Sequence, residues 1–239
     1  MDVTIFSEVR WSSRRGLSPP APRRRSGKPS LFQENSRKLY FSPGACSLSP
    51  HIALREAGLA FDLAQVDLKA KTTKSGGDFR AINPKGQVPT LELDDGEVLT
   101  EGPAIVQYIA DRKPEAKLAP AAGTLERYRL QEWLNYVTSE MHKGFSPLFN
   151  PNAPDQWKQT VKDMLAQRLD FLSKKLESKP YLMGGTFTVA DGYLFTILGW
   201  GKYHNIDYAA KWPVLQAYQD RVSERPAVQA ALKAEGLLK

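Results

Sequence analysis

The stretch that decides the fold is residues 38–49, with the sequence K-L-Y-F-S-P-G-A-C-S-L-S. Residues 39–41 are apolar and aromatic, as expected of a short buried strand, and the turn residues Pro43 and Gly44 end that strand. The chain's only cysteine, Cys46, follows at once. The stretch therefore predicts a strand, a tight turn and then a single sulfur atom.

A helix is predicted directly after the cysteine, over residues 49–58. Ser47 or Ser49 can cap its N-terminus, Pro50 suits its first turn, and a glycine ends it. A thiol beside free helix N–H groups ionises more easily than an ordinary thiol, whose pKa is about 8.5. Cys46 is therefore a candidate reactive thiolate, and the alternative is a small buried apolar residue.

The composition is that of an ordinary globular protein. With 239 residues, of which 41% are hydrophobic, the chain can form one large domain or two smaller ones. A single cysteine excludes an internal disulfide, a Cys-x-x-Cys redox motif and a zinc site built from such motifs. No apolar run approaches the ~20 residues that span a bilayer. We therefore expect a cytoplasmic protein with no metal and no membrane partner.

The net charge of +7 is concentrated at the N-terminus. Residues 1–38 carry nine Lys or Arg and three acidic residues, whereas the remaining 201 residues have a net charge of only +1. The body of the protein therefore gives no indication of a nucleic-acid partner. Residues 1–37 are rich in Arg, Ser, Pro and Gly, which predicts a disordered basic tail. The alternatives are a transit-like or polyanion-binding arm, or a start codon assigned too far upstream.

Residues 38–112 predict a compact α/β unit with the element order βαβαββα. Strands are expected at residues 39–41, 61–68, 87–93 and 97–99, and helices at 49–58, 78–82 and 103–111. Asp95 and Gly96 connect the last two strands as a hairpin turn. Pro89 lies inside one of these strands, where it cannot donate a ladder hydrogen bond. One solution is a cis bond after Val88 that leaves the Val88 backbone free for an extended ligand.

A linker over residues 113–124 leads to an all-helical domain over residues 125–239. The apolar spacing predicts helices over residues 130–141, 157–176 and 212–222. Thr188 and Asp191 form a capping box ahead of a further helix at 193–200, so both are expected to be structural.

Seven short segments, in order across both parts, resemble the bacterial beta class of the cytosolic glutathione transferases. They are Pro43-Gly44-Ala45-Cys46-Ser47, Asn83-Pro84-Lys85-Gly86-Gln87-Val88-Pro89, Leu99-Thr100-Glu101-Gly102, Trp133-Leu134-Asn135-Tyr136, Glu140-Met141-His142-Lys143-Gly144-Phe145, Ser146-Pro147-Leu148-Phe149 and Phe187-Thr188-Val189-Ala190-Asp191. The resemblance extends from Lys38 to Lys239. It implies a thioredoxin-like N-terminal domain, an all-α C-terminal domain and glutathione as co-substrate.

The resemblance also assigns roles to residues of the first domain. Cys46 is expected to contact glutathione and to form a mixed disulfide with it. Val88 is expected to pair with the cysteinyl main chain, Glu101 with the γ-glutamyl ammonium, and Lys71 with the glycyl carboxylate. The backbone N–H of Gly102, at a helix start, is expected to bind the neighbouring carboxylate. Many relatives have serine at this position, so a side-chain hydroxyl contact is missing here.

A polar helix face in the second domain completes the expected glutathione site. Asn135, Ser139 and His142 are spaced four and then three residues apart, so they share one face, which Lys143 flanks. The resemblance makes this face a wall of the site, with His142 near the Cys46 sulfur to orient the thiol or accept its proton. The alternative is a solvated surface.

The second substrate is expected to be a small hydrophobic electrophile. Phe145, Trp200 and Tyr203 are candidates for its pocket, or else core residues. Lys85 is expected to be structural or solvated. The function predicted is a detoxifying, glutathione-dependent conjugation or reduction by a homodimer. One alternative is a non-catalytic binding or regulatory protein with this fold. Another is a tail that tethers the chain to nucleic acid or an acidic membrane.

Overall fold

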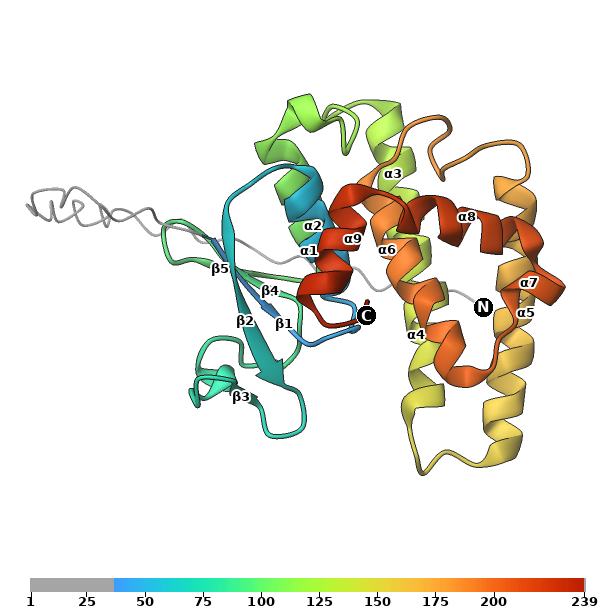
Figure 1. The fold of residues 1–239 in the computed structure, drawn as a ribbon, viewed down its shortest axis with the longest axis horizontal. Coiled ribbons are helices and arrows are strands. Elements are labelled where there is room, and N and C mark those ends of the chain that lie inside the picture. The colour runs from blue at the N-terminus through green and yellow to red at the C-terminus, as the bar shows by residue number, and fades with distance from the viewer. Residues whose placement is uncertain (1–36, 239) are drawn as a thin grey trace, which may run out of the picture. The chain divides into compact units, whose positions relative to one another are not determined.

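Residues 37–238 are described by the computed structural model, and a mixed sheet of five strands comes first (Figure 1). Strand β1 (Arg37–Phe41) pairs in parallel with β2 (Phe61–Asp67) and antiparallel with β4 (Thr90–Glu92), which pairs with β5 (Val98–Thr100). The strand order is β3-β2-β1-β4-β5. The predicted strands and hairpin are confirmed, except that β4 begins at Thr90, so Pro89 lies just before the strand and not inside it as predicted. Predictions for residues 1–36 lie outside the described part.

The connection between β2 and β4 differs from the prediction. It contains a two-residue strand that was not predicted, β3 (Thr72–Thr73), and the predicted helix at 78–82 is a single 3₁₀ turn, η1 (Phe79–Ala81). The Asp78 carboxylate accepts a hydrogen bond from the Arg80 N–H at 2.9 Å and so caps this turn. Since Asn83 and Pro84 follow almost at once, no longer helix can form.

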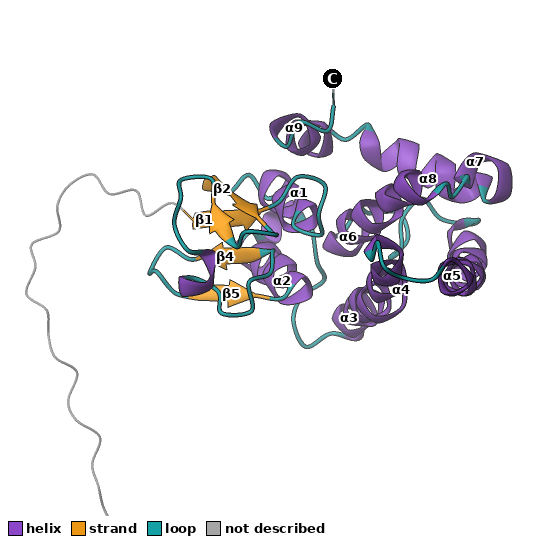
Figure 2. Ribbon diagram, turned by 90° about the horizontal axis from the view of Figure 1, so that it is seen from below, coloured by secondary structure: helices purple, strands orange, loops and turns teal. Residues whose placement is uncertain are grey.

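Two helices cover the face of the sheet that is turned toward the helical part of the chain (Figure 2). They are α1 (Leu48–Glu56) and α2 (Gly102–Arg112). The apolar side chains between them and the sheet include Leu39, Ile52 and Ile105, all fully buried. A smaller apolar cluster, with Phe79 at its centre, fills the opposite face under the 3₁₀ turn.

The remainder of the described chain is helical, which confirms the predicted class. The helices are α3 (Leu125–Tyr136), α4 (Lys143–Phe145), α5 (Asp155–Leu176), α6 (Val189–Leu198), α7 (Tyr208–Lys211), α8 (Pro213–Ser223) and α9 (Pro226–Ala234). Helix α1 packs against both α6 and α9 (Figure 2), so the apolar core continues from the sheet into the helices. Among residues 37–238, no helix has the length and apolarity needed to cross a membrane.

The helix predicted over residues 130–141 is not regular. Helix α3 ends at Tyr136, and residues Val137–His142 form a π-helical segment, η3, before α4 begins. A π-helical turn contains more residues than an α-helical turn, so the side chains that follow it point in different directions from those expected of a continuous α-helix. The prediction of one shared face for Asn135, Ser139 and His142 relied on α-helical spacing.

Thr188 and Asp191 form the predicted capping box at the start of α6. The Asp191 carboxylate accepts hydrogen bonds from the Thr188 N–H at 2.9 Å, the Leu182 N–H at 2.8 Å and the Tyr218 hydroxyl at 3.1 Å. Burial raises the pKa of Asp191, while these hydrogen bonds act in the opposite direction. The network holds the start of α6, the helix that carries Tyr193 of the candidate site.

Candidate functional site

The loop between β1 and α1 carries Cys46 and is held at both ends. Gly44 has a φ of +70°, a conformation that glycine adopts without strain. Its N–H donates to the Glu235 carboxylate at 2.9 Å, and its carbonyl accepts from the Trp200 indole N–H at 2.9 Å. Ser47 lies at the N-cap position, but its hydroxyl oxygen accepts from the Ser42 N–H at 3.1 Å instead of capping α1. The predicted serine cap is therefore wrong, because this side chain closes the loop.

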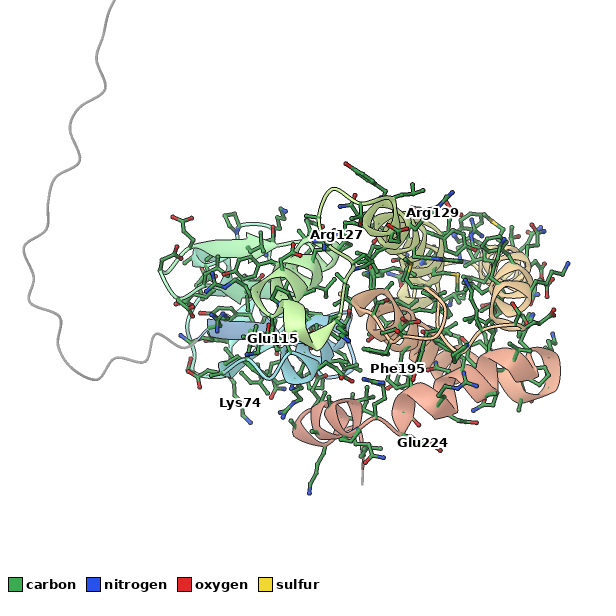
Figure 3. All side chains as sticks on the ribbon, turned by 90° about the horizontal axis from the view of Figure 1, so that it is seen from above. Lys74, Glu115, Arg127, Arg129, Phe195 and Glu224 are labelled. Atoms are coloured by element: carbon green, nitrogen blue, oxygen red, sulfur yellow. The ribbon has the colours of Figure 1, made fainter. Side chains whose placement is uncertain are left out.

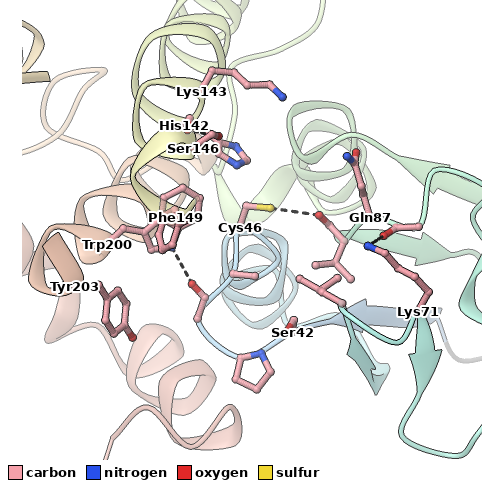
Figure 4. A pocket seen from close by; sticks show the side chains of 16 residues that line it. Ser42, Cys46, Lys71, Gln87, His142, Lys143, Ser146, Phe149, Trp200 and Tyr203 are labelled. Atoms are coloured by element: carbon pink, nitrogen blue, oxygen red, sulfur yellow. Dashed lines mark hydrogen bonds between the residues drawn. The ribbon is translucent and has the colours of Figure 1, made fainter. Parts of the chain in front are cut away.

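Cys46 lies in a cavity of about 560 Å³ between the sheet domain and the helices (Figure 4). Its thiol donates a hydrogen bond to the Val88 carbonyl oxygen at 3.3 Å. Burial raises the pKa of Cys46 to about 11, outweighing the neighbouring N–H groups and the Lys143 ammonium, which lower it. The expectation of a thiolate with a lowered pKa is therefore wrong for the ligand-free protein, since the thiol is neutral.

Val88 and Lys71 lie where the sequence predicted, at the edge of this cavity. The Val88–Pro89 bond is cis, as proposed. The Val88 carbonyl is engaged by the Cys46 thiol, so a ligand that pairs with it must share or displace that contact. The Lys71 ammonium donates to the Gly86 carbonyl at 2.8 Å and retains two further protons for a carboxylate. Lys71 is therefore positioned to bind an anion at the mouth.

A second, smaller cavity of about 110 Å³ adjoins the first at Cys46, Val88 and His142. Glu101 and Gly102 line it at the start of α2, as expected of an ammonium and carboxylate site. Glu101 has a φ of +68°, which is uncommon for a residue with a side chain.

Lys85 has a partner that the sequence did not indicate. Its ammonium lies 2.7 Å from the Glu101 carboxylate and donates to the Thr100 hydroxyl at 3.0 Å. Lys85 is exposed, as predicted. Its ammonium is paired with the Glu101 carboxylate, which was expected to bind the ammonium of glutathione. A ligand that uses Glu101 must therefore compete with Lys85 or share the carboxylate with it.

His142 lines both cavities together with Cys46. Its Nδ1 atom lies 2.7 Å from the Tyr193 hydroxyl, and its ring packs edge-on against Trp200 with centroids 5.0 Å apart. Burial, followed by the nearby Lys143 ammonium, lowers the pKa of His142 to about 4. A neutral imidazole with so low a pKa is a poor acceptor for a thiol proton, so this lowered pKa favours orientation of the sulfur over general-base catalysis.

Two predicted wall residues do not reach these two cavities. Asn135 and Ser139 are exposed on the helical part, and the Ser139 hydroxyl donates to the Asn135 carbonyl at 3.1 Å. The π-helical segment instead turns Thr138 toward the smaller cavity, where Tyr193 also lies. Lys143 lines both cavities, as predicted. Within one copy of the chain, the structure therefore gives no support to the prediction that Asn135 and Ser139 form a wall of the glutathione site.

Aromatic side chains form the wall of the larger cavity opposite Lys71 (Figure 4). Trp200 and Tyr203 belong to it, in agreement with the prediction, whereas Phe145 is fully buried behind Trp200 and is a core residue. Phe149 completes the wall and was missed. Its segment was quoted above for its resemblance, but nothing in the spacing showed which of its aromatic residues faces the cavity.

Gln87, Ser146, Thr138 and Tyr193 are further lining residues that the sequence did not single out. Gln87 was the most accessible of these to prediction, because it directly precedes Val88. In the described part of the chain, no group of three or more His, Cys, Asp or Glu side chains is arranged to hold a metal ion.

Comparison with known proteins relates both parts of the chain to one family. Residues 44–112 match the family described as "Glutathione S-transferase, N-terminal domain", and residues 136–226 match "Glutathione S-transferase, C-terminal domain". The first match contains Cys46, Lys71, Val88 and Glu101, and the second contains His142. The two matches therefore include residues from both sides of the cavities.

Solved structures show the same similarity over 84% of this chain and 100% of each relative. A bacterial glutathione transferase called BphK, described as a ternary complex, has 62% sequence identity and a TM-score of 0.82. A beta-class enzyme of Sphingomonas chungbukensis has 53% identity and a TM-score of 0.82. A sphingomonad glutathione S-transferase complexed with glutathione has 51% identity and a TM-score of 0.81.

Proposed function

The chain belongs to the glutathione S-transferase family, a family of transferase enzymes, with beta-class relatives, and on that premise we propose that it joins glutathione to small hydrophobic electrophiles. The observation that carries the proposal is the meeting of two adjoining cavities at Cys46, Val88 and His142. The smaller offers a carboxylate and a helix start, and the larger offers a cation and an aromatic wall.

Glutathione fits across both cavities in one orientation. Its γ-glutamyl end has an ammonium and a carboxylate, which suit Glu101 and the backbone N–H groups at the start of α2 in the smaller cavity. Its glycyl carboxylate suits the Lys71 ammonium in the larger cavity. The cysteinyl unit then lies between them, alongside the Val88 backbone, with its sulfur next to Cys46.

The proposed reaction breaks the S–H bond of glutathione and then exchanges the bond to the leaving group for a carbon–sulfur bond. The glutathione thiol loses its proton to solvent, and the sulfur lone pair forms a carbon–sulfur bond while the leaving group departs with its bonding electrons. The Lys143 ammonium favours the thiolate by its charge, and neutral His142 orients the sulfur by hydrogen bonding. The aromatic wall shields the electrophile from water.

Cys46 is also proposed to exchange with glutathione disulfide. After its proton has passed to solvent, the Cys46 sulfur would attack one sulfur of the disulfide, forming a Cys46–glutathione mixed disulfide and releasing one glutathione thiolate. The sequence contains no second cysteine to resolve this bond, so a further glutathione must do so. The hydrogen bond from the Cys46 thiol to the Val88 carbonyl, together with burial, keeps Cys46 protonated. This hydrogen bond must therefore open before the sulfur can react.

A second copy of the chain is the proposed protein partner. Helix α3 exposes two large side chains, Leu125 at 65% and Tyr128 at 60%, which a partner surface would cover. Detoxification in the cytoplasm is likewise proposed, on the strength of the family and the single cysteine. The non-catalytic alternative is not favoured, because a pure interaction protein needs no converging glutathione site.

A conjugation assay tests the proposal. Purified protein is applied to immobilised glutathione and then incubated with glutathione and 1-chloro-2,4-dinitrobenzene, alongside Cys46→Ala and His142→Ala variants. We expect retention of the intact protein and reduced kcat/KM in both variants, with Thr186→Ala, an exposed substitution outside both cavities, as the matched control. An intact protein that neither binds the resin nor converts any of a panel of electrophiles would falsify the enzyme proposal.

A further inference from the structure

A third cavity lies behind the aromatic wall, and we name it the rear chamber. It has a volume of about 160 Å³ and is enclosed by the Cys46 loop, α6 and the C-terminal segment. Its lining is dominated by apolar side chains, namely Leu48, Phe195, Trp200, Tyr203, Leu232, Leu237 and Leu238. Neither the conjugation step nor the glutathione site described above uses this space.

The rear chamber shares a wall with the cavity that holds Cys46. Gly44, Trp200 and Tyr203 line both cavities. The Trp200 indole is fixed by its hydrogen bond to the Gly44 carbonyl, but Tyr203 is 55% exposed (Figure 4). Tyr203 is therefore the part of the shared wall that is not held in the core, and the two spaces are separated there by an exposed side chain.

The size and chemistry of the rear chamber specify its occupant. An apolar protein cavity of about 150 Å³ binds benzene, so this space accepts an apolar group of one-ring size. Among the described residues that line it, Lys202 alone is charged, and its ammonium lies over the Tyr203 ring at 5.0 Å. With so few polar groups, the chamber offers a charged ligand little to replace its hydration.

We infer that the rear chamber receives the apolar tail of the electrophile, while the reactive carbon stays beside the glutathione sulfur. The inference rests on the proposed function and names its substrate class: electrophiles with an alkyl or aryl tail long enough to pass Tyr203. Burial of each additional methylene in the chamber strengthens binding about fourfold.

The C-terminal segment fixes the chamber relative to the sulfur. A Leu237 methyl carbon lies 3.5 Å from the position that a Cβ atom at Gly44 would occupy. Two residues earlier, the Glu235 carboxylate accepts from the Gly44 N–H and contacts His51 Nδ1 at 2.8 Å. The wall of the chamber and the loop that carries Cys46 are thus tied to the same short segment.

Gly199 offers a way to fill the chamber. It lines the cavity, its φ of −55° suits any residue, and a Cβ atom added there meets no neighbour within 4 Å. Gly199→Leu therefore starts a branched side chain from the chamber lining at a position where its Cβ atom has room. Gly185→Leu is the matched control, because Gly185 has equally open surroundings and lines none of the cavities described. Leu238→Trp, at the exposed mouth, is a second blocking variant that avoids the core.

The test measures the binding of S-methyl-, S-butyl-, S-hexyl- and S-octylglutathione by calorimetry, with chain folding checked by circular dichroism. In the intact protein and in Gly185→Leu, affinity is expected to rise with chain length up to the octyl compound. In Gly199→Leu and Leu238→Trp, the octyl compound should bind at least tenfold more weakly than in the intact protein, with S-methylglutathione unchanged.

Two outcomes overturn the inference. One is an affinity that does not rise with chain length in the intact protein, and the other is the same rise in both blocking variants, which would place the tail in the larger cavity alone. Either result leaves the proposed function standing, provided that glutathione itself binds. Failure of glutathione and S-methylglutathione to bind contradicts the proposed function and the chamber with it.

Discussion

At the scale of single residues, the neutral state of Cys46 is the main departure from what its sequence position suggests. A thiol next to a helix start ought to ionise easily, yet helix α1 begins at Leu48 and the sulfur faces the Val88 carbonyl. Desolvation outweighs the nearby N–H groups and raises the pKa of the thiol. The position of Cys46 next to a helix start could be predicted from the sequence, but the burial of its thiol depends on contacts with residues far away in the sequence.

The raised Cys46 pKa gives a measurable pH dependence. Only the thiolate reacts with iodoacetamide, so the alkylation rate of the ligand-free protein should keep rising above pH 9 toward a midpoint of about 11. The measurement is the rate of mass gain between pH 6 and 10.5, with free cysteine as the control. A plateau already reached at pH 8.5 would show that the thiol is not desolvated as described.

His142 should remain neutral across the physiological range. Its pKa is lowered to about 4 by burial and by Lys143, so its imidazole gains a proton only in acid. Nuclear magnetic resonance of ring-labelled histidine should show no titration of His142 between pH 5.5 and 8, with His142→Gln used to assign the signal. A midpoint near 6.5 would show that burial and Lys143 do not lower the pKa of His142 as described.

Lys85 should weaken glutathione binding by competing for Glu101. Because the ion pair between Lys85 and Glu101 is exposed, it contributes only about 0.2–1 kcal/mol. Removing the Lys85 cation should therefore change the affinity for glutathione by a factor of roughly 1.5 to 5. We therefore expect Lys85→Gln to bind glutathione that much more tightly in calorimetry. A glutathione analogue without its amino group is the control and should show no gain. Weaker glutathione binding in Lys85→Gln would mean that Lys85 assists the ligand.

At the scale of elements, the π-helical segment η3 (Val137–His142) explains why the wall of the site was only partly predicted. The apolar spacing of residues 130–141 is that of an α-helix, and no proline or glycine marks an interruption. His142 and Lys143 still reach the cavities, whereas Thr138 takes the place expected for Asn135 and Ser139. A local change of helical register depends on packing against α5 and α6, which a sequence pattern does not reveal.

Helix α9 and the segment after it hold the Cys46 loop through buried hydrogen bonds. Arg55 Nε donates to His51 Nε2 at 2.9 Å, so the other ring nitrogen of His51 carries a proton and donates to Glu235. The Glu235 carboxylate therefore satisfies two donors, the buried His51 Nδ1–H and the half-buried Gly44 N–H.

Loss of that carboxylate should destabilise the protein. Glu235→Ala leaves the fully buried His51 Nδ1–H unpaired, at a cost of about 1–3 kcal/mol, whereas the half-buried Gly44 N–H can bind water instead, so the free energy of unfolding should fall by about 1–3 kcal/mol. Urea denaturation measures this fall. Glu224→Ala, an exposed change at the end of α8, is the control (Figure 3). Equal stability of the two variants would show that the network contributes nothing.

At the scale of the whole molecule, the order and type of the elements could be predicted because local patterns repeat across both parts of the chain. The alternating strands, the Asp95-Gly96 turn and the capping box at Thr188 each specify local structure by themselves. What could not be predicted is where distant segments meet. Tyr193 and the rear chamber lie beside Cys46 because α1 packs against α6 and α9, and Phe149 lies there because its ring packs edge-on against Trp200, with centroids 5.2 Å apart.

The central claim is that glutathione binds across the two cavities that meet at Cys46. The most direct measurement is a crystal structure of the protein grown with glutathione. The account predicts one tripeptide with its ammonium at Glu101, its glycyl carboxylate at Lys71 and its sulfur beside Cys46. Empty cavities at saturating glutathione, or a tripeptide bound elsewhere on the surface, would contradict it.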